Sequence, residues 1–122
     1  MVIRTASVVL SLAGLLALIS GLLFWTDIAV NLISMHMLLG LLAVAALWVI
    51  GIAQAFSKAR SRIIAGCTLA VGTLMIIIGM SQSSLMAGEF HWVIRVTHLA
   101  LGVLIVGLGH VAAARYRKGS AG

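Results

Sequence analysis

The sequence predicts an all-α membrane protein, an antiparallel bundle of four transmembrane helices built from two duplicated helical hairpins. The first observation is composition: of 122 residues, 63% are hydrophobic and only 8% are charged, a balance that excludes a water-soluble domain of this size. The second is the presence of four long stretches without Lys, Arg, Asp or Glu. The third is a motif that recurs in the second and fourth of these stretches. Together they predict a bundle embedded in lipid.

Each charge-free stretch is long enough for one transmembrane helix, because crossing about 30 Å of hydrocarbon takes about 20 apolar residues. The stretches lie between Arg4 and Asp27, Asp27 and Lys58, Arg62 and Glu89, and Arg95 and Arg115. We therefore expect helices at about 6–25, 31–56, 62–83 and 92–114, in a single transmembrane domain over residues 1–122. The first resembles a signal peptide, but its apolar run is long and its cleavage-like segment weak, so we expect an uncleaved helix.

The charged residues indicate how the bundle is oriented. If the four helices alternate in direction, seven of the eight basic residues fall on one side and both acidic residues on the other. The seven are Arg4, Lys58, Arg60, Arg62, Arg115, Arg117 and Lys118. Basic residues collect on the cytoplasmic side of membranes, so we expect a multi-pass protein of a bacterial-type inner membrane with both termini in the cytoplasm. Because these charges lie at membrane edges, we expect the lipid bilayer, and no nucleic acid, as a partner.

The second and fourth expected helices share the motif His-x-x-Leu-Gly. Segment 36–44 aligns with segment 98–106, and the two histidines are 62 residues apart. The first and third expected helices align more faintly through glycines seven residues apart, which lie on one helical face. These glycines are Gly14 and Gly21 in the first helix and Gly72 and Gly79 in the third. The chain therefore reads as two copies of one helical hairpin.

His36 and His98, the motif histidines, are the candidate metal ligands. Each lies about six residues into its helix, or about 9 Å along the axis, so the two share a depth. In an up-down-up-down bundle the second and fourth helices are diagonal neighbours across the core. Polar side chains are costly at membrane depth, and bis-histidine ligation of one haem iron between these helices would explain both residues.

Four glycines and one arginine complete the candidate cofactor-binding site. Gly40 and Gly102 follow the two histidines by one helical turn, and Gly21 and Gly79 lie near the outer ends of the other two helices. Hydrogen in place of a side chain leaves volume for a macrocycle. Arg95 shares a helix face with the histidine three positions after it. Its planar guanidinium suits haem propionates directed to the outer surface.

Each of these residues also has a simpler interpretation. The glycines can serve close packing between helices. The two histidines can be satisfied by hydrogen bonds to Ser34, to Thr97 or to each other. Arg95 can extend to the membrane interface or pair with Glu89 or Asp27.

The two remaining histidines do not form a second haem site. His110 lies about 18 Å beyond His98 along the same helix, and the second helix has no histidine at the matching depth. His91 lies at the entrance of the fourth helix, where we expect an interfacial residue. The sequence therefore predicts at most one bis-histidine haem.

With this topology and histidine spacing, the chain resembles one four-helix half of haem A synthase, in which haem is held between histidines of the second and fourth helices near the outer face. The resemblance covers nearly the whole chain and implies that His36 and His98 hold haem. In that family a glutamate stands three residues before the histidine of the catalytic haem site, a position occupied here by Ile33. This difference argues against haem hydroxylation. It leaves the function of small membrane b-type cytochromes, which the chain also resembles: single-electron transfer, often from a quinol or to a redox protein.

The leading hypothesis is a haem b electron-transfer protein, an oxidoreductase or electron-transfer subunit rather than a stand-alone enzyme. A hypothesis of another class is a structural or assembly subunit without cofactor, which packs its glycine faces against a larger membrane complex or a second copy. A proton-coupled exporter ranks third, because no Asp or Glu falls within an expected helix. No quinone motif is specific enough to identify the redox partner.

Overall fold

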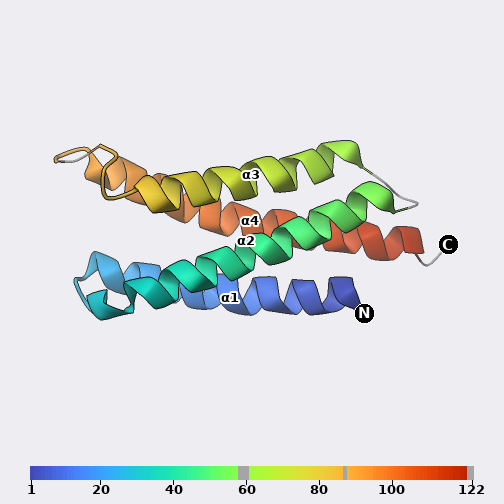
Figure 1. Cartoon of the computed structure of the whole chain (residues 1–122), viewed down its shortest axis with the longest axis horizontal. Helices are drawn as coiled ribbons and strands as arrows, with labels where there is room; N and C mark the ends of the chain where they lie inside the picture. Colours follow the sequence, from blue (N-terminus) through green and yellow to red (C-terminus); the bar gives the residue numbers. More distant parts are fainter. Residues whose placement is uncertain (58–60, 87, 121–122) are drawn as a thin grey trace.

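The computed structural model describes residues 1–57, 61–86 and 88–120 and contains four antiparallel helices (Figure 1). They are α1 (Val2–Trp25), α2 (Ile33–Phe56), preceded by the short 3-10 helix η1 (Val30–Leu32), α3 (Arg62–Ser81) and α4 (His91–Ser120). Each of the four α-helices is long and apolar enough to cross a membrane. The predicted all-α fold of four transmembrane helices is thus confirmed.

The ends of two helices lie beyond the predicted spans. Helix α1 begins at Val2 and α4 continues to Ser120, whereas the sequence suggested about 6 and 114. Charged residues mark the edge of the hydrocarbon, but a helix gains one backbone hydrogen bond for each residue it adds and can continue past that edge. Arg117 and Lys118 in the last turn of α4 also interact favourably with the negative end of the helix dipole.

Helices α2 and α4 form the shorter diagonal of the bundle. Each of them contacts all three of the other α-helices, whereas α1 and α3 make no contact with each other through the described residues. The expected diagonal relationship of α2 and α4 is therefore present, and these two helices meet at the centre. The start of α1, the end of α4 and the ends of α2 and α3 nearest their connection all lie at one end (Figure 1).

Contacts of equivalent glycines follow the internal repeat. A Cβ atom added to Gly14 in α1 would meet Cγ2 of Val106 in α4, at 2.6 Å, and one added to Gly72 in α3 would meet Cγ1 of Val44 in α2, at 3.1 Å. The two glycines are equivalent in the repeat, and so are the two valines. The same interface therefore occurs twice, once between α1 and α4 and once between α2 and α3, as duplicated hairpins require.

The packed core occupies only one half of the bundle, the half that contains the chain termini. Its fully buried side chains include Leu10, Leu47 and Ile50. At the opposite end, only Ile94 is buried among residues 14–42 and the described part of 73–104. In Figure 1 the α1–α2 and α3–α4 hairpins lie farther apart toward that end. We call it the open half, and it contains both motif histidines.

The outer surface of the bundle is apolar over all four helices. Exposed large hydrophobic side chains occur on every one of them, for example Leu12 at 58%, Leu38 at 52%, Ile77 at 55% and Val103 at 58% exposure. Such a surface is not compatible with water but suits contact with acyl chains. The helices therefore account for the expected partnership with a lipid bilayer.

Candidate functional site

His36 of α2 and His98 of α4 face each other in the open half. Their imidazole ring centroids lie 6.2 Å apart, with ring planes tilted by 50°. Both side chains are half-buried. The structure thus brings together the two histidines that the repeat and their common depth singled out, although they are far apart in the sequence.

Ser20 of α1 is the hydrogen-bond partner of His36. Its Oγ lies 2.9 Å from Nδ1 of the imidazole, and the same hydroxyl donates to the carbonyl oxygens of Leu16 at 2.9 Å and Ala17 at 3.0 Å. A hydroxyl has one proton, and within a helix it normally donates to the preceding turn. If Ser20 keeps that proton on its own backbone, Nδ1 of His36 is the donor to Ser20 and the lone pair of His36 is on Nε2.

Phe24, one turn beyond Ser20 on α1, restrains the same imidazole from the side. Its ring meets the His36 ring edge to face, with centroids 5.3 Å apart and planes at 70°. Edge-to-face contacts of this kind are favoured because a positive ring edge meets a negative ring face. The His36 ring is therefore held both by a hydrogen bond and by an aromatic contact.

His98 lacks the corresponding hydrogen bond. Its Nδ1 atom is buried and has no hydrogen-bond partner among the described residues. The repeat explains this difference, because the position in α3 equivalent to Ser20 is occupied by Ile78. A buried polar atom without a partner is destabilising by about 1–3 kcal/mol, so the arrangement calls for an explanation.

Gly21 and Gly79 lie against the two imidazoles. A Cβ at Gly21 would be 3.3 Å from Cε1 of His36, and one at Gly79 would be 3.0 Å from Cε1 of His98. Both distances are tighter than ordinary van der Waals contact. The space left by these two glycines is thus occupied by the histidine rings.

A Cβ atom would meet open space at Gly40 and an ordinary van der Waals contact at Gly102. No atom lies within 4 Å of a Cβ placed on Gly40, and the nearest atom to one on Gly102 is Cε of Met75, at 3.7 Å. Both residues are half-buried and lie one turn after the motif histidines, toward the packed core. Neither glycine is therefore tightly packed against a neighbouring helix, unlike Gly21 and Gly79.

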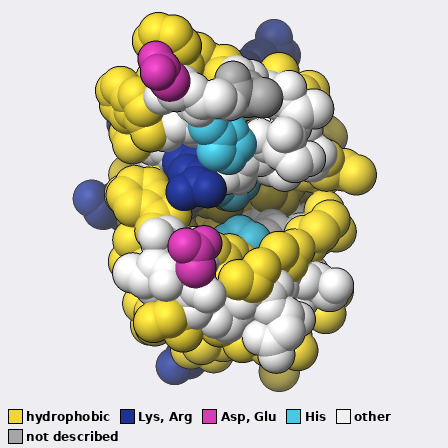
Figure 2. Space-filling model, turned by 90° about the vertical axis from the view of Figure 1, so that its left-hand side faces the viewer, with side chains coloured by type: hydrophobic (Ala, Val, Ile, Leu, Met, Phe, Trp, Pro, Cys, Tyr) yellow, Lys and Arg dark blue, Asp and Glu magenta, His cyan; other side chains and the backbone are white. Residues whose placement is uncertain are grey.

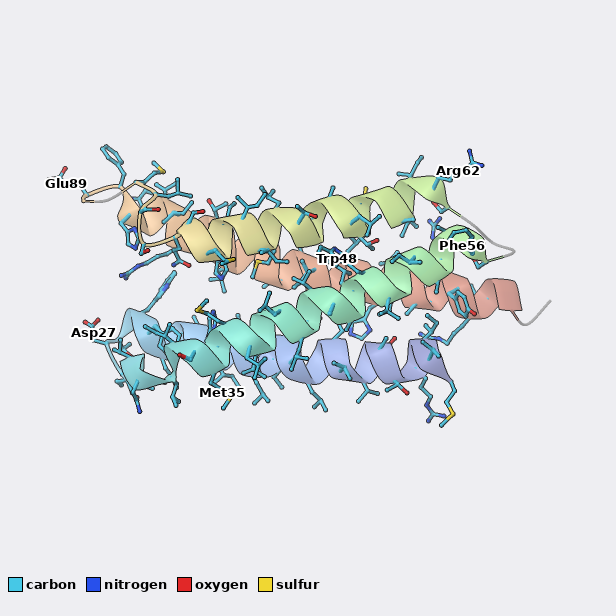
Figure 3. The ribbon with its side chains drawn as sticks, viewed as in Figure 1. Asp27, Met35, Trp48, Phe56, Arg62 and Glu89 are labelled. Atoms are coloured by element: carbon cyan, nitrogen blue, oxygen red, sulfur yellow. The ribbon has the colours of Figure 1, made fainter. Side chains whose placement is uncertain are left out.

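The open half ends in a hollow on the molecular surface. Figure 2 looks onto this end of the bundle. Histidine side chains and a basic side chain border a depression between the upper and lower parts of the view, with an acidic side chain on either side. Asp27 and Glu89 lie at this end of the bundle, opposite Phe56 and Arg62 (Figure 3). Arg95 is exposed near the start of α4 and forms no ion pair with either acid in the part of the chain that the structure describes.

The other two histidines lie outside the pair. Nδ1 of His91, the first residue of α4, lies 3.4 Å from the carbonyl oxygen of Leu85 in the turn before it. Nε2 of His110 lies 3.1 Å from Oγ of Ser11, in the packed half. The structure therefore does not bring either residue to His36 or His98.

Two site residues were missed by the sequence reasoning. The alternative interpretation without a cofactor named Ser34, Thr97 or the histidines themselves as hydrogen-bond partners, but Ser20 is the partner of His36, and the Thr97 hydroxyl donates to the carbonyl of Val93 at 2.8 Å. The available signal was position: Ser20 directly precedes Gly21, at the depth of His36. Phe24 follows by one turn on the same face.

Comparison with models of known protein families, with curated proteins and with solved structures gives no match to this chain. The family relationship suggested by the histidine motif therefore remains a resemblance of pattern. What the chain can do must be argued from its own residues, above all from the histidine pair and its surroundings.

Proposed function

We propose that this chain binds one haem b between His36 and His98 and transfers single electrons within the membrane. The observation that carries the proposal is the 6.2 Å separation of the two imidazole centroids on opposing helices of the open half. An imidazole nitrogen binds a transition metal at about 2 Å, so two nitrogens on one ion lie about 4 Å apart and their ring centroids somewhat farther. The observed separation is in this range.

The number of protein ligands favours haem over a bare metal ion. No cluster of three or more His, Cys, Asp or Glu that could hold an ion occurs in residues 1–57, 61–86 and 88–120. Structural and catalytic metal ions usually take three or four protein ligands. Two opposed imidazoles instead match an iron that already has four equatorial ligands from a porphyrin.

The tautomer of His36 also fits this role. In the tautomer with Nδ1–H, this nitrogen donates to Ser20 at 2.9 Å and the Nε2 lone pair is available. Metal-bound histidines usually have such a donor bond at the second nitrogen, which fixes the ring and increases its basicity. Met35 and Met37, which would suit copper, are instead exposed at 54% and 48% and lie on other faces of α2.

The surroundings of the pair offer space and charge for a macrocycle. A Cβ at Gly40 would meet no atom within 4 Å, one at Gly102 would meet only Met75 at 3.7 Å, and the open half has almost no buried side chain among the described residues. Arg95, exposed at the outer end and without an ion-pair partner among the described residues, is suited to propionate groups. The basic residues beside the chain termini cannot serve, because they lie at the far end of the bundle.

Bis-histidine ligation favours electron transfer over substrate activation. When bound, haem would supply one-electron redox chemistry, with His36 and His98 as the residues that hold it. The chain contributes two imidazoles and apolar surroundings, and it would hold the site near one face of the membrane. The resemblance to haem A synthase and to small b-type cytochromes points the same way, and Ile33 lacks the carboxylate of the hydroxylating site.

The membrane setting and partner are part of the same proposal. The basic residues at the end with the termini favour a bacterial-type inner membrane with that end in the cytoplasm. The haem would then lie toward the outer face. A quinol, a redox protein or a larger membrane complex would serve as electron partner.

An optical spectrum of the purified chain tests the proposal directly. The chain is expressed in a host supplied with haem, and spectra are recorded with and without dithionite for the parent and for His36→Ala, His98→Ala and His110→Ala. We expect sharp low-spin bands in the parent and in His110→Ala, and a lost or converted spectrum in the other two. A parent without haem, or three variants with equal spectra, would instead favour the cofactor-free structural subunit.

A further inference from the structure

We infer that the two imidazoles are not equivalent: Ser20 is a positioning residue that fixes His36, and Ile78 leaves His98 as the ligand that detaches. The inference rests on the haem site proposed above and deepens it. It assigns the face of His98 as the place where a small external ligand such as carbon monoxide can bind.

The two histidines can be compared directly, because they occupy equivalent positions of the internal repeat. A Cβ added to Gly21 would lie 3.3 Å from Cε1 of His36, and one added to Gly79 would lie 3.0 Å from the same atom of His98. The two rings therefore have the same relationship to the neighbouring helix. What differs is the residue immediately before each glycine, Ser20 in α1 and Ile78 in α3.

The hydroxyl of Ser20 gives His36 two advantages as a ligand. It would fix the Nδ1–H tautomer, because a hydroxyl whose one proton stays on the carbonyl oxygen of Leu16 or Ala17 can only accept from His36. It also increases electron donation from Nε2, as acceptors at the second nitrogen of metal-bound histidines do. Phe24 adds a steric restraint on rotation of the ring.

The side chain of Ile78 gives His98 neither advantage. Nδ1 of His98 is buried without a hydrogen-bond partner in the described ranges. The Ser81 hydroxyl, which donates to the carbonyl oxygen of Ile77 at 2.7 Å, makes no hydrogen bond to His98 in the described ranges. Binding through Nε2 leaves the Nδ1–H of His98 without an acceptor. Rotation of the ring away from the iron would let this group reach water in the outer hollow, so detachment is favoured on this side.

Histidine tautomers in the cofactor-free protein provide the first test. In ¹⁵N-histidine NMR spectra of the apoprotein in detergent micelles, we expect the Nδ1–H form for His36 in the parent and a mixture in Ser20→Ala. Assignment uses His36→Ala. A His36 signal that is the same in Ser20→Ala and the parent would overturn the role of Ser20, whether or not haem binds.

Carbon monoxide binding to the reduced protein provides the second test. We expect the parent to bind it, and Ile78→Ser, which restores an acceptor beside His98, to bind it about 10–100-fold more weakly, the usual size of effects from groups that support a ligand. The matched control is Ile77→Ser, which places the same hydroxyl at a lipid-facing position with 55% exposure. It should behave as the parent does.

The outcomes separate the inference from the proposed function. Absence of a haem spectrum in the parent defeats the haem site itself. A normal low-spin spectrum with no carbon monoxide binding, or with equal binding in the parent and Ile78→Ser, defeats the inference alone. Weakening in Ile77→Ser to the same degree would also defeat it, because the effect would then not depend on contact with His98.

Discussion

The imidazole of His98 packs directly against Gly79 of α3: a Cβ at this glycine would lie 3.0 Å from Cε1 of the ring. Gly21 has the same relationship to His36, at 3.3 Å. The glycines of the first and third helices thus determine how far each histidine ring can approach the neighbouring helix. A larger residue at either position must displace the ring.

Replacing Gly79 with leucine should displace His98 and remove most of the haem. Leucine is favourable in lipid, so the helix should still insert, but overpacking at a tight contact forces a neighbour to move. Gly66→Leu is the matched control, because it lies on the same helix with no atom within 4 Å of a Cβ. Haem-to-protein ratios measure the effect, and equal ratios in the two variants would contradict it.

Replacing Gly40 or Gly102 with leucine should remove or tilt the haem, and at Gly40 this should not disturb the apoprotein. A Cβ on Gly40 meets no atom within 4 Å, so the cofactor-free bundle can accept the larger side chain. A bound macrocycle one turn from its ligands could not. Thermal unfolding of the Gly40→Leu apoprotein should therefore be unchanged while haem occupancy falls. Full occupancy in both variants would make these glycines ordinary packing residues.

Much of the fold followed from hydrophobicity and charge alone. Four helices were predicted because each charge-free stretch matches the thickness of a bilayer, and the repeat identified which helices are equivalent. The end of α4 was less predictable. Arg115 marks where the chain leaves the hydrocarbon, but the helix continues to Ser120, because backbone hydrogen bonding does not depend on lipid.

The pairing of His36 with His98 could be predicted from depth, but the partner of His36 could not. A serine in an apolar helix usually bonds its own backbone, as Ser20 also does. Whether it reaches a histidine as well depends on how α1 and α2 are rotated about their axes. Periodicity in one sequence does not determine that rotation when all faces of a helix are apolar.

Replacing Arg95 with glutamine should weaken haem binding and lower the reduction potential. Arg95 is the one basic residue near the outer end, and loss of a positive charge disfavours the extra electron on the iron. Its exposure limits the effect on affinity to about fivefold, since exposed ion pairs contribute about 1 kcal/mol or less. Redox titration and haem transfer to apomyoglobin measure the two changes. Arg62→Gln, at the far end, should alter neither.

The orientation of the bundle can be tested with single cysteines in a Cys67→Ser background. Ser57→Cys adjoins the C-terminal end of α2, and Ser84→Cys lies in the turn after α3, at the opposite end of the bundle. If the basic end is cytoplasmic, an impermeant maleimide added to intact spheroplasts should label only Ser84→Cys. Lysis should expose Ser57→Cys. Labelling of Ser57→Cys in intact cells would reverse the topology.

The division of the bundle into a packed half and an open half makes stability and cofactor binding separable. Leu10 is fully buried against Gly109 of α4, in the half that contains the termini. Leu10→Ala should lower the free energy of unfolding by about 2–5 kcal/mol, the usual cost of removing a buried leucine side chain. Leu12→Ala, at a lipid-facing position with 58% exposure, is the control and should cost much less. Unfolding in mixed micelles with increasing SDS measures both values.

Because the histidine pair lies in the open half, the folded fraction of Leu10→Ala should keep the haem spectrum of the parent. Loss of haem from that folded fraction would mean that the packed half positions the histidines, and the two halves would then be one cooperative unit.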